Sequence, residues 1–161
     1  MNDMAKMGDS SAVPVTNDDR PSFFEPMSLD WAPWVMEGTH FKLLNVDGKT
    51  GGFTLLLKVD PGVVAPTHGH LGMVEGIILE GEFGYDEDDR GGPGAYIMEN
   101  GGVDHQPDSP GGTTMFAIAY GPLCGYNPDG TVAAIVDAKM MYALAKEAGQ
   151  LAPHIKDPME A

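Results

Sequence analysis

The chain has 161 residues, with 24 acidic and 9 basic side chains and a formal net charge of −15. This length suits one domain with a hydrophobic core of its own. The acidic balance argues against nucleic-acid binding and against anionic membrane surfaces, because both require clustered Lys and Arg. No apolar run reaches the roughly 18 residues of a membrane span, and we expect no secretory signal in the polar N-terminal stretch. The single cysteine, Cys124, allows no intrachain disulfide, so we expect a cytoplasmic protein.

Short apolar runs separated by glycine and proline dominate the chain after a polar segment, residues 1–25, that we expect to form a flexible tail. One domain is expected over residues 26–150, and a C-terminal tail over residues 151–161. Many short strands with no helix between them predict an all-β fold, an antiparallel sandwich or barrel. We expect the strands at Thr39–Val46, Gly52–Val59, Val74–Glu80, Glu82–Asp86, Gly94–Met98 and Thr113–Tyr120.

One helix is expected near the C-terminus. Asp137 is a suitable N-cap residue, and Gly149 is a suitable residue to end the helix. The apolar residues between them recur at helical spacing, which predicts a helix that packs on the domain and carries no cofactor. This stripe comprises Met141, Leu144, Ala145 and Ala148.

Two of the five histidines, His68 and His70, are one residue apart. A strand places both on one face, where two imidazoles can reach the same ion. His105 follows a glycine-rich turn and can join them from a neighbouring strand. The alternative is three surface or hydrogen-bonded histidines. His40 and His154 have no such context, and we expect both to be structural.

The spacing around these histidines resembles the two sequence motifs of the cupin family. In the first motif, five residues separate Gly62 from His68-x-His70, and Gly81 follows His70 by eleven positions. In the second motif, Gly94 is followed by Asn100-x-Gly102 and then by His105. The second motif departs from the family at Asn100, where proline is usual, and at Ser109, where asparagine is usual. Cupins are double-stranded β-helix (jelly-roll) barrels that hold a metal in the bore, so the resemblance implies that fold with an added C-terminal helix.

Three further stretches, HFKLLNVDGKTGGFTLLLKVDPG, LEGEFGY and YNPDGTVAAIVDA, resemble one cupin subgroup over roughly residues 31–150. That subgroup contains 2,4′-dihydroxyacetophenone dioxygenase and the acetylacetone-cleaving cupin dioxygenases. The resemblance implies a non-haem Fe(II) dioxygenase that uses O2 to cleave a C–C bond in a β-diketone or an aryl α-hydroxyketone. Zn(II), Ni(II) or Mn(II) could occupy the same ligands in purified protein.

Glu75, Glu87 and Glu99 are the candidate carboxylates for this site. Strand alternation, read through a hairpin turn at Gly81, favours an inward face that would put Glu75 and Glu87 opposite each other. The usual glycine spacing of the first motif would instead put the carboxylate at the position of Val74. The resemblance implies that Glu87 is a fourth metal ligand beside His68, His70 and His105, that Glu75 is a catalytic pocket group, and that Glu99 orients the site. The alternative for all three is a solvent-exposed position.

The expected pocket is apolar and lined by Ile77, Leu79, Phe83, Tyr85, Ile97, Phe116 and Ile118, with Trp31 and Trp34 as lids. Tyr85 or Tyr120 could donate a hydrogen bond to a substrate oxygen. Two other functions stay open: a non-catalytic sensor resembling the C-terminal domain of zinc-binding anti-sigma factors, and an oxygen-independent isomerase or lyase. We expect a homodimer or higher oligomer that pairs through sheet edges and the WAPWVM segment.

Overall fold

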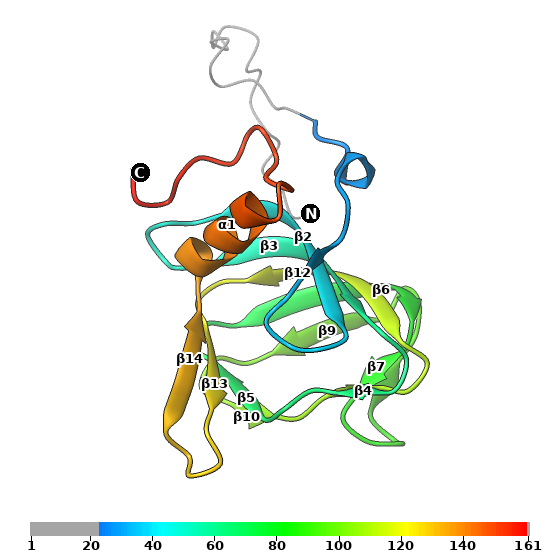
Figure 1. Ribbon diagram of the computed structural model, residues 1–161. Helices are drawn as coiled ribbons and strands as arrows, with labels where there is room; N and C mark the ends of the chain where they lie inside the picture. Colours follow the sequence, from blue (N-terminus) through cyan, green and yellow to red (C-terminus); the bar gives the residue numbers. More distant parts are fainter. Residues whose placement is uncertain (1–22, 161) are drawn as a thin grey trace, which may run out of the picture.

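Three antiparallel sheets enclose a barrel in the computed structural model, which describes residues 23–160 (Figure 1). One wall is a six-stranded sheet, in the order β1 (Ala32–Pro33), β2 (Thr39–Val46), β3 (Phe53–Val59), β12 (Thr113–Ala119), β6 (Val74–Gly81) and β9 (Tyr96–Glu99). The facing wall consists of two four-stranded sheets. The first contains β10 (Asp104–His105), β5 (His68–His70), β13 (Leu123–Tyr126) and β14 (Val132–Val136). The second contains β4 (Val63–Val64), β11 (Asp108–Ser109), β7 (Phe83–Gly84) and β8 (Arg90–Gly91). The predicted all-β barrel is therefore confirmed.

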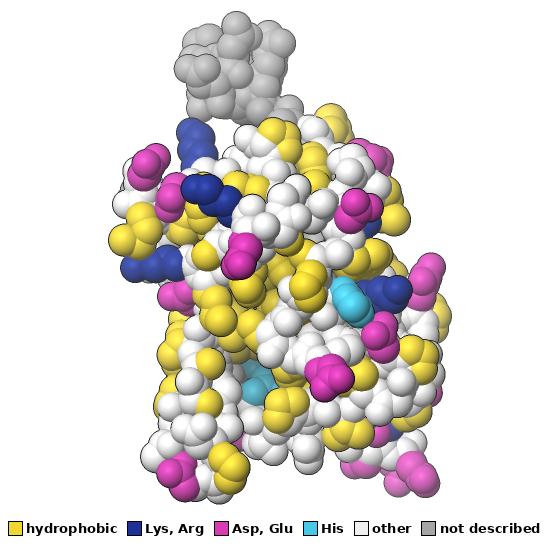
Figure 2. All heavy atoms as spheres, in the orientation of Figure 1, with side chains coloured by type: hydrophobic (Ala, Val, Ile, Leu, Met, Phe, Trp, Pro, Cys, Tyr) yellow, Lys and Arg dark blue, Asp and Glu magenta, His cyan; other side chains and the backbone are white. Residues whose placement is uncertain are grey.

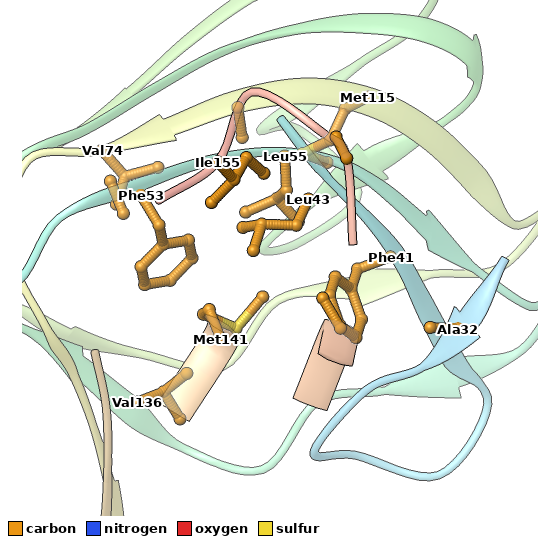
Figure 3. Close-up of a cluster of buried hydrophobic side chains, with 14 of the residues drawn as sticks. Ala32, Phe41, Leu43, Phe53, Leu55, Val74, Met115, Val136, Met141 and Ile155 are labelled. Atoms are coloured by element: carbon orange, nitrogen blue, oxygen red, sulfur yellow. The ribbon is translucent and has the colours of Figure 1, made fainter. Parts of the chain in front are cut away.

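Alternate residues of the large sheet fill the barrel interior. On β2 and β3 the inward side chains include Phe41, Leu43 and Phe53, all of which are buried. Burial of one such side chain stabilises the fold by about 1.5–3 kcal/mol. Figure 3 shows these residues converging with Met141 and Ile155, which come from the C-terminal part of the chain. The core therefore joins the sheet to the residues that follow it.

Helix α1 (Ala138–Glu147) begins where the sequence predicts. The Asp137 side chain accepts a hydrogen bond from the Met140 amide at 2.9 Å, and Gly149 adopts a positive φ of 68° beyond the helix end. Met141 and Ala145 are buried against β2 and its neighbours. The segment that follows, expected as a tail over residues 151–161, packs back onto the core through Ala152 and Ile155.

A β-bulge near the end of β6 reverses the alternation that the sequence suggested. Thr114 pairs with Glu80 but Met115 pairs with Ile78, so Leu79 is an extra residue in β6. One extra residue exchanges the inward and outward faces of a strand. Before the bulge the inward residues of β6 are Val74, Gly76 and Ile78, whereas Glu75, Ile77 and Leu79 point outward.

The strand pairing also differs from a simple hairpin at Gly81. β6 pairs with β9 and β12, whereas β7 pairs with β8 and β11, so β6 and β7 do not face each other. Gly81 has φ +74°, and a Cβ there would lie 2.0 Å from the Gly112 carbonyl oxygen. The chain therefore needs glycine at this point to turn from the large sheet into the opposite wall.

The outer face of the large sheet is only partly covered by the chain itself. The segment around the 3-10 helix η2 (Pro26–Ser28) crosses the face at β2, where it buries Lys42 beneath Trp31 and Met27. The outward residues of β6 and β9 have no such cover from the described residues, and several are large and apolar. No helix within residues 23–160 has the length and hydrophobicity to span a membrane.

Candidate metal centre

Three histidines from two neighbouring strands meet inside the barrel. His68 and His70 lie on the same face of β5, and His105 on β10 is paired directly with His68. The short strand β5 is held on its other side by β13, which pairs Leu123 with His70 and Gly125 with His68. The three-residue strand therefore receives backbone hydrogen bonds on both edges, and its histidines have a fixed register.

The Nε2 atoms of the three histidines converge on one point. His70 Nε2 lies 3.0 Å from His105 Nε2, which lies 3.1 Å from His68 Nε2. Within residues 23–160, this trio is the one group of three or more His, Cys, Asp or Glu residues whose ligand atoms all lie within 4.8 Å of one another. Three ring nitrogens so close together cannot all carry a proton, so the arrangement presents lone pairs to a common centre.

The surroundings keep these imidazoles neutral. Burial lowers the pKa of His70 to about 3, and it also lowers the pKa of His68 and of His105 below the ordinary value of 6.5. The Nδ1 atom of His68 lies 2.9 Å from the Pro66 carbonyl oxygen, to which only a protonated Nδ1 can donate. This bond fixes the tautomer in which Nε2 is free to ligate. The donor set therefore fits a divalent first-row metal.

Glu99 supplies a carboxylate to the same point from the opposite wall. Its Oε2 lies 3.5 Å from His70 Nε2, and its Oε1 lies 3.5 Å from His105 Nε2. The side chain is only 9% exposed, and burial raises the pKa of this carboxyl group. The Tyr85 hydroxyl donates a hydrogen bond to Glu99 Oε1 and holds the carboxylate in place.

The other two predicted carboxylates lie elsewhere. Glu87, expected as the fourth ligand, is exposed in the turn between β7 and β8. Glu75, expected in the pocket, lies on the outer face of β6 and accepts hydrogen bonds from the hydroxyls of Tyr96 and Tyr120. The bulge at Leu79 explains why Glu75 faces outward. Phe83 points into the barrel, but the extra residue between the two positions puts Glu75 on the opposite face. His40 and His154 lie outside the site as expected, against Asp60 and the Leu44 carbonyl oxygen.

An apolar cavity of about 80 Å³ leads away from His68, His70 and Glu99 into the barrel. The predicted lining is right for Phe83 and for Trp34, and wrong for Ile77, Leu79, Phe116 and Ile118, which point to the other side of the sheet. Val74 lines the cavity at the position indicated by the glycine spacing of the first motif. Sequence reasoning missed most of the remaining lining, which includes Leu55, Leu57, Met115, Ala117 and Leu123.

A groove on the surface adjoins this cavity. It runs between the β13–β14 hairpin and the segment around Val35, and Figure 2 shows histidine atoms at the bottom of a hydrophobic hollow beside that hairpin. Trp34, Met36, His68 and Leu123 line both the groove and the cavity. The indole nitrogen of Trp34 lies 3.1 Å from Met141 Sδ, which ties this part of the wall to α1.

Comparison with solved structures supports the fold. A cupin-like protein of unknown function from Ralstonia eutropha JMP134 is 24% identical, with a TM-score of 0.74 over 83% of this chain and 88% of that one. An RmlC-like cupin from the same organism is 22% identical, with a TM-score of 0.74 over 86% and 94% of the two chains. An acetylacetone dioxygenase from Acinetobacter johnsonii is 18% identical, with a TM-score of 0.64 over 89% and 96%. At this level of identity the likeness establishes the cupin fold.

A sequence-family model gives the more specific assignment. Residues 20–124 match the model of the ChrR cupin-like domain, whereas no curated protein sequence matches the chain. The matched range contains all three histidines and Glu99. The resemblance to small bacterial cupins is confirmed, and the chain belongs to the ChrR cupin-like domain family.

Proposed function

We propose that this protein is a metal-dependent cupin enzyme, a non-haem Fe(II) dioxygenase that cleaves a C–C bond in a β-diketone or an aryl α-hydroxyketone. The observation that carries the proposal is the convergence of three neutral imidazole nitrogens at the end of an apolar cavity. His68, His70 and His105 would hold the metal. When bound, Fe(II) would act as a Lewis acid on the ketone and as a template that brings it together with O2, while the electrons that reduce O2 would come from the cleaved substrate.

The cavity favours a small, uncharged substrate. Its walls are almost entirely apolar, and apart from the histidines the ionisable residues that line it are Glu99 and Asp108. Asp108 Oδ1 forms an ion pair with a guanidinium nitrogen of Arg90 at 2.6 Å. No Lys or Arg side chain lines the cavity. A carboxylate substrate would therefore lose its hydration without gaining a cationic side chain, and only the metal would offset its charge, whereas a neutral ketone has no charge to offset.

Glu99 is the group that we assign to proton transfer. Enolisation of a ketone requires a base near the α-carbon, and a carboxyl group with a raised pKa suits that task. The Tyr85 hydrogen bond is made to Oε1. We therefore assign the uptake of the substrate's proton to Oε2, which lies on the side of His70. The apolar residues around it, such as Leu55 and Met115, would keep water away from the enolate.

The experiment is oxygen uptake by metal-free protein that has been reloaded with Fe(II) under anaerobic conditions. Uptake is measured with a panel of β-diketones and aryl hydroxyketones. We expect uptake that requires iron and a ketone, that is lost in His105→Ala, and that is retained in His40→Ala, the matched variant outside the site. An iron-loaded protein that consumes no oxygen with any ketone would remove the dioxygenase proposal.

The second candidate is a metal-binding domain without turnover, and the family match to the ChrR cupin-like domain favours it. A third is an isomerase or lyase that uses the same ligands without oxygen. Ketone conversion that continues under anaerobic conditions would indicate the isomerase or lyase. Tight metal binding with no conversion under either condition would indicate the sensor.

A further inference from the structure

We propose that a hydrogen bond on the outside of the barrel, from Tyr126 to Asp104, positions His105 for metal binding. Both are positioning residues, which act through the strands that carry them and not by contact with the ion. The bond passes over Gly69, the residue between the two histidines of β5. The proposal rests on the metal centre of the proposed function and is independent of the reaction.

The strand that carries His105 has little backbone pairing to hold it. β10 consists of two residues and lies at the edge of its sheet, where it pairs with β5. In this pairing Asp104 is opposite Gly69, and His105 is opposite His68. A short edge strand with few backbone hydrogen bonds opens easily, so a side-chain contact at this point strongly affects where His105 lies.

The Tyr126–Asp104 bond supplies such a contact. Adjacent residues of a strand point to opposite faces, so Asp104 points outward where His105 points into the barrel. Its Oδ1 accepts a hydrogen bond from the Tyr126 hydroxyl at 2.8 Å. Tyr126 is on β13, on the far side of β5 (Figure 1), so the two side chains together span two strand spacings, roughly 10 Å. The bond therefore ties the edge strand to the third strand of the sheet.

The backbone and the chemistry of Tyr126 both suit this role. The ladder between β13 and β14 is irregular between Gly125 and Tyr126, and irregularities of this kind re-aim a side chain. The hydrogen bond to Asp104 raises the pKa of Tyr126 to about 12. The hydroxyl therefore keeps its proton at neutral pH and stays a donor.

Gly69 leaves the space through which the bond passes. A Cβ at this position would lie 2.7 Å from the Tyr126 hydroxyl oxygen and closer still to Asp104 Oδ1. Both atoms are at the ends of side chains that can move, and the backbone of Gly69 does not have a positive φ. Alanine could therefore be accommodated, but only by displacing the Tyr126–Asp104 bond. Gly69 thus offers a second, independent way to break it.

The test uses Co(II) bound to the full chain, because the visible absorption of this ion reports the geometry of its ligands. We expect Tyr126→Phe and Gly69→Ala to change that absorption in the same way. Each should weaken Co(II) binding about fivefold, as the loss of one hydrogen bond does. Combined, they should weaken binding no more than either does alone, because both remove the same bond. A purely structural role would lower stability towards urea without altering the absorption of the bound ion.

Two further substitutions serve as matched controls. Asp104→Asn keeps an oxygen that can accept from Tyr126 and should preserve the absorption, whereas Asp104→Ala should reproduce the effect of Tyr126→Phe. Tyr120→Phe removes a tyrosine–carboxylate bond from the outer face of the large sheet and should change neither the absorption nor the affinity.

The outcomes separate this proposal from the metal centre on which it rests. If the unaltered chain binds Co(II) and both Tyr126→Phe and Gly69→Ala bind it with the same absorption and affinity, the positioning role is overturned and the metal centre stands. Losses that add up in the combined variant would mean two separate effects and would also overturn the positioning role. An unaltered chain that binds no Co(II) would overturn both.

Discussion

Val74 lies directly opposite Glu99 in the register of β6 and β9, and both side chains line the cavity beside the histidines. Strand β6 therefore presents a valine where the usual spacing of the first motif would present a carboxylate. The carboxylate comes instead from the neighbouring strand. As a result, the site consists of three histidines and an adjacent glutamate, which Tyr85 holds in place.

Restoring a carboxylate on β6 should strengthen metal binding. We expect Val74→Glu to raise affinity for Zn(II) or Ni(II) about tenfold or more, which requires only about 1.4 kcal/mol from the new ligand. The same substitution should destabilise the metal-free protein, because it buries a charge beside Glu99. Isothermal titration and thermal unfolding measure the two effects. Val64→Glu, at an exposed position, is the control and should change neither.

Glu99, and not Glu87, should control metal affinity. Replacing a carboxylate that contacts the ligating histidines typically costs about 10–100-fold in metal affinity or activity, and we expect that loss in Glu99→Gln. Glu87→Gln alters an exposed turn residue and should bind metal as the unaltered protein does. Competition with a coloured chelator measures both constants. A larger loss in Glu87→Gln would show that the turn closes onto the metal.

Two tyrosine–carboxylate pairs, one inside the barrel and one outside, provide a matched comparison. Tyr85→Phe leaves the buried Glu99 without its donor and should lower the free energy of unfolding by about 1–3 kcal/mol. It should also shift metal affinity. Tyr120→Phe removes the equivalent bond to Glu75 on the outer face and should leave metal affinity unchanged. Urea unfolding and metal titration of the two variants test this, and equal effects on affinity would contradict it.

The buried histidines should make the metal-free protein sensitive to acid. The pKa of His70 is lowered from 6.5 to about 3 in the folded protein, so below pH 6.5 the unfolded chain binds more protons than the folded one. Stability must then fall as pH decreases from about 6.5 towards 3, by up to about 1.4 kcal/mol per pH unit for each such histidine.

Urea unfolding at pH 6.5 and 5.5 isolates this effect, because most carboxylates are still ionised in that range. We expect His70→Asn to reduce the dependence and His154→Gln, a change at an exposed histidine, to preserve it. An unaltered slope in His70→Asn would show that folding does not lower the pKa of His70.

The sequence was sufficient for the barrel, the helix and the histidines, because each depends on local or short-range signals. Asp137 and Gly149 mark the helix ends, and the His68-x-His70 spacing requires only that a strand place both residues on one face. The predicted strand Thr39–Val46 is reproduced at both ends as β2.

The carboxylates could not be assigned in the same way, because their positions depend on non-local pairing. A single extra residue, Leu79, decides which face of β6 carries Glu75, and only the partner strand β12 reveals it. Likewise, no sequence pattern indicates that Tyr85 reaches Glu99, since the two lie on segments that meet only after the barrel closes. The glycine spacing of the first motif points to Val74 as an inward position of this strand. That spacing was the sequence signal that could have corrected the placement of Glu75 on the inward face.

The most direct test of the metal centre is the stoichiometry of metal binding to the unaltered chain and to single alanine variants of His68, His70 and His105. We expect one divalent ion per chain, retained in His40→Ala and lost or weakened at least 100-fold, or about 2.7 kcal/mol, in each of the three variants. If the unaltered chain binds no ion, or if the three variants bind it as tightly as His40→Ala does, the site is not a metal centre.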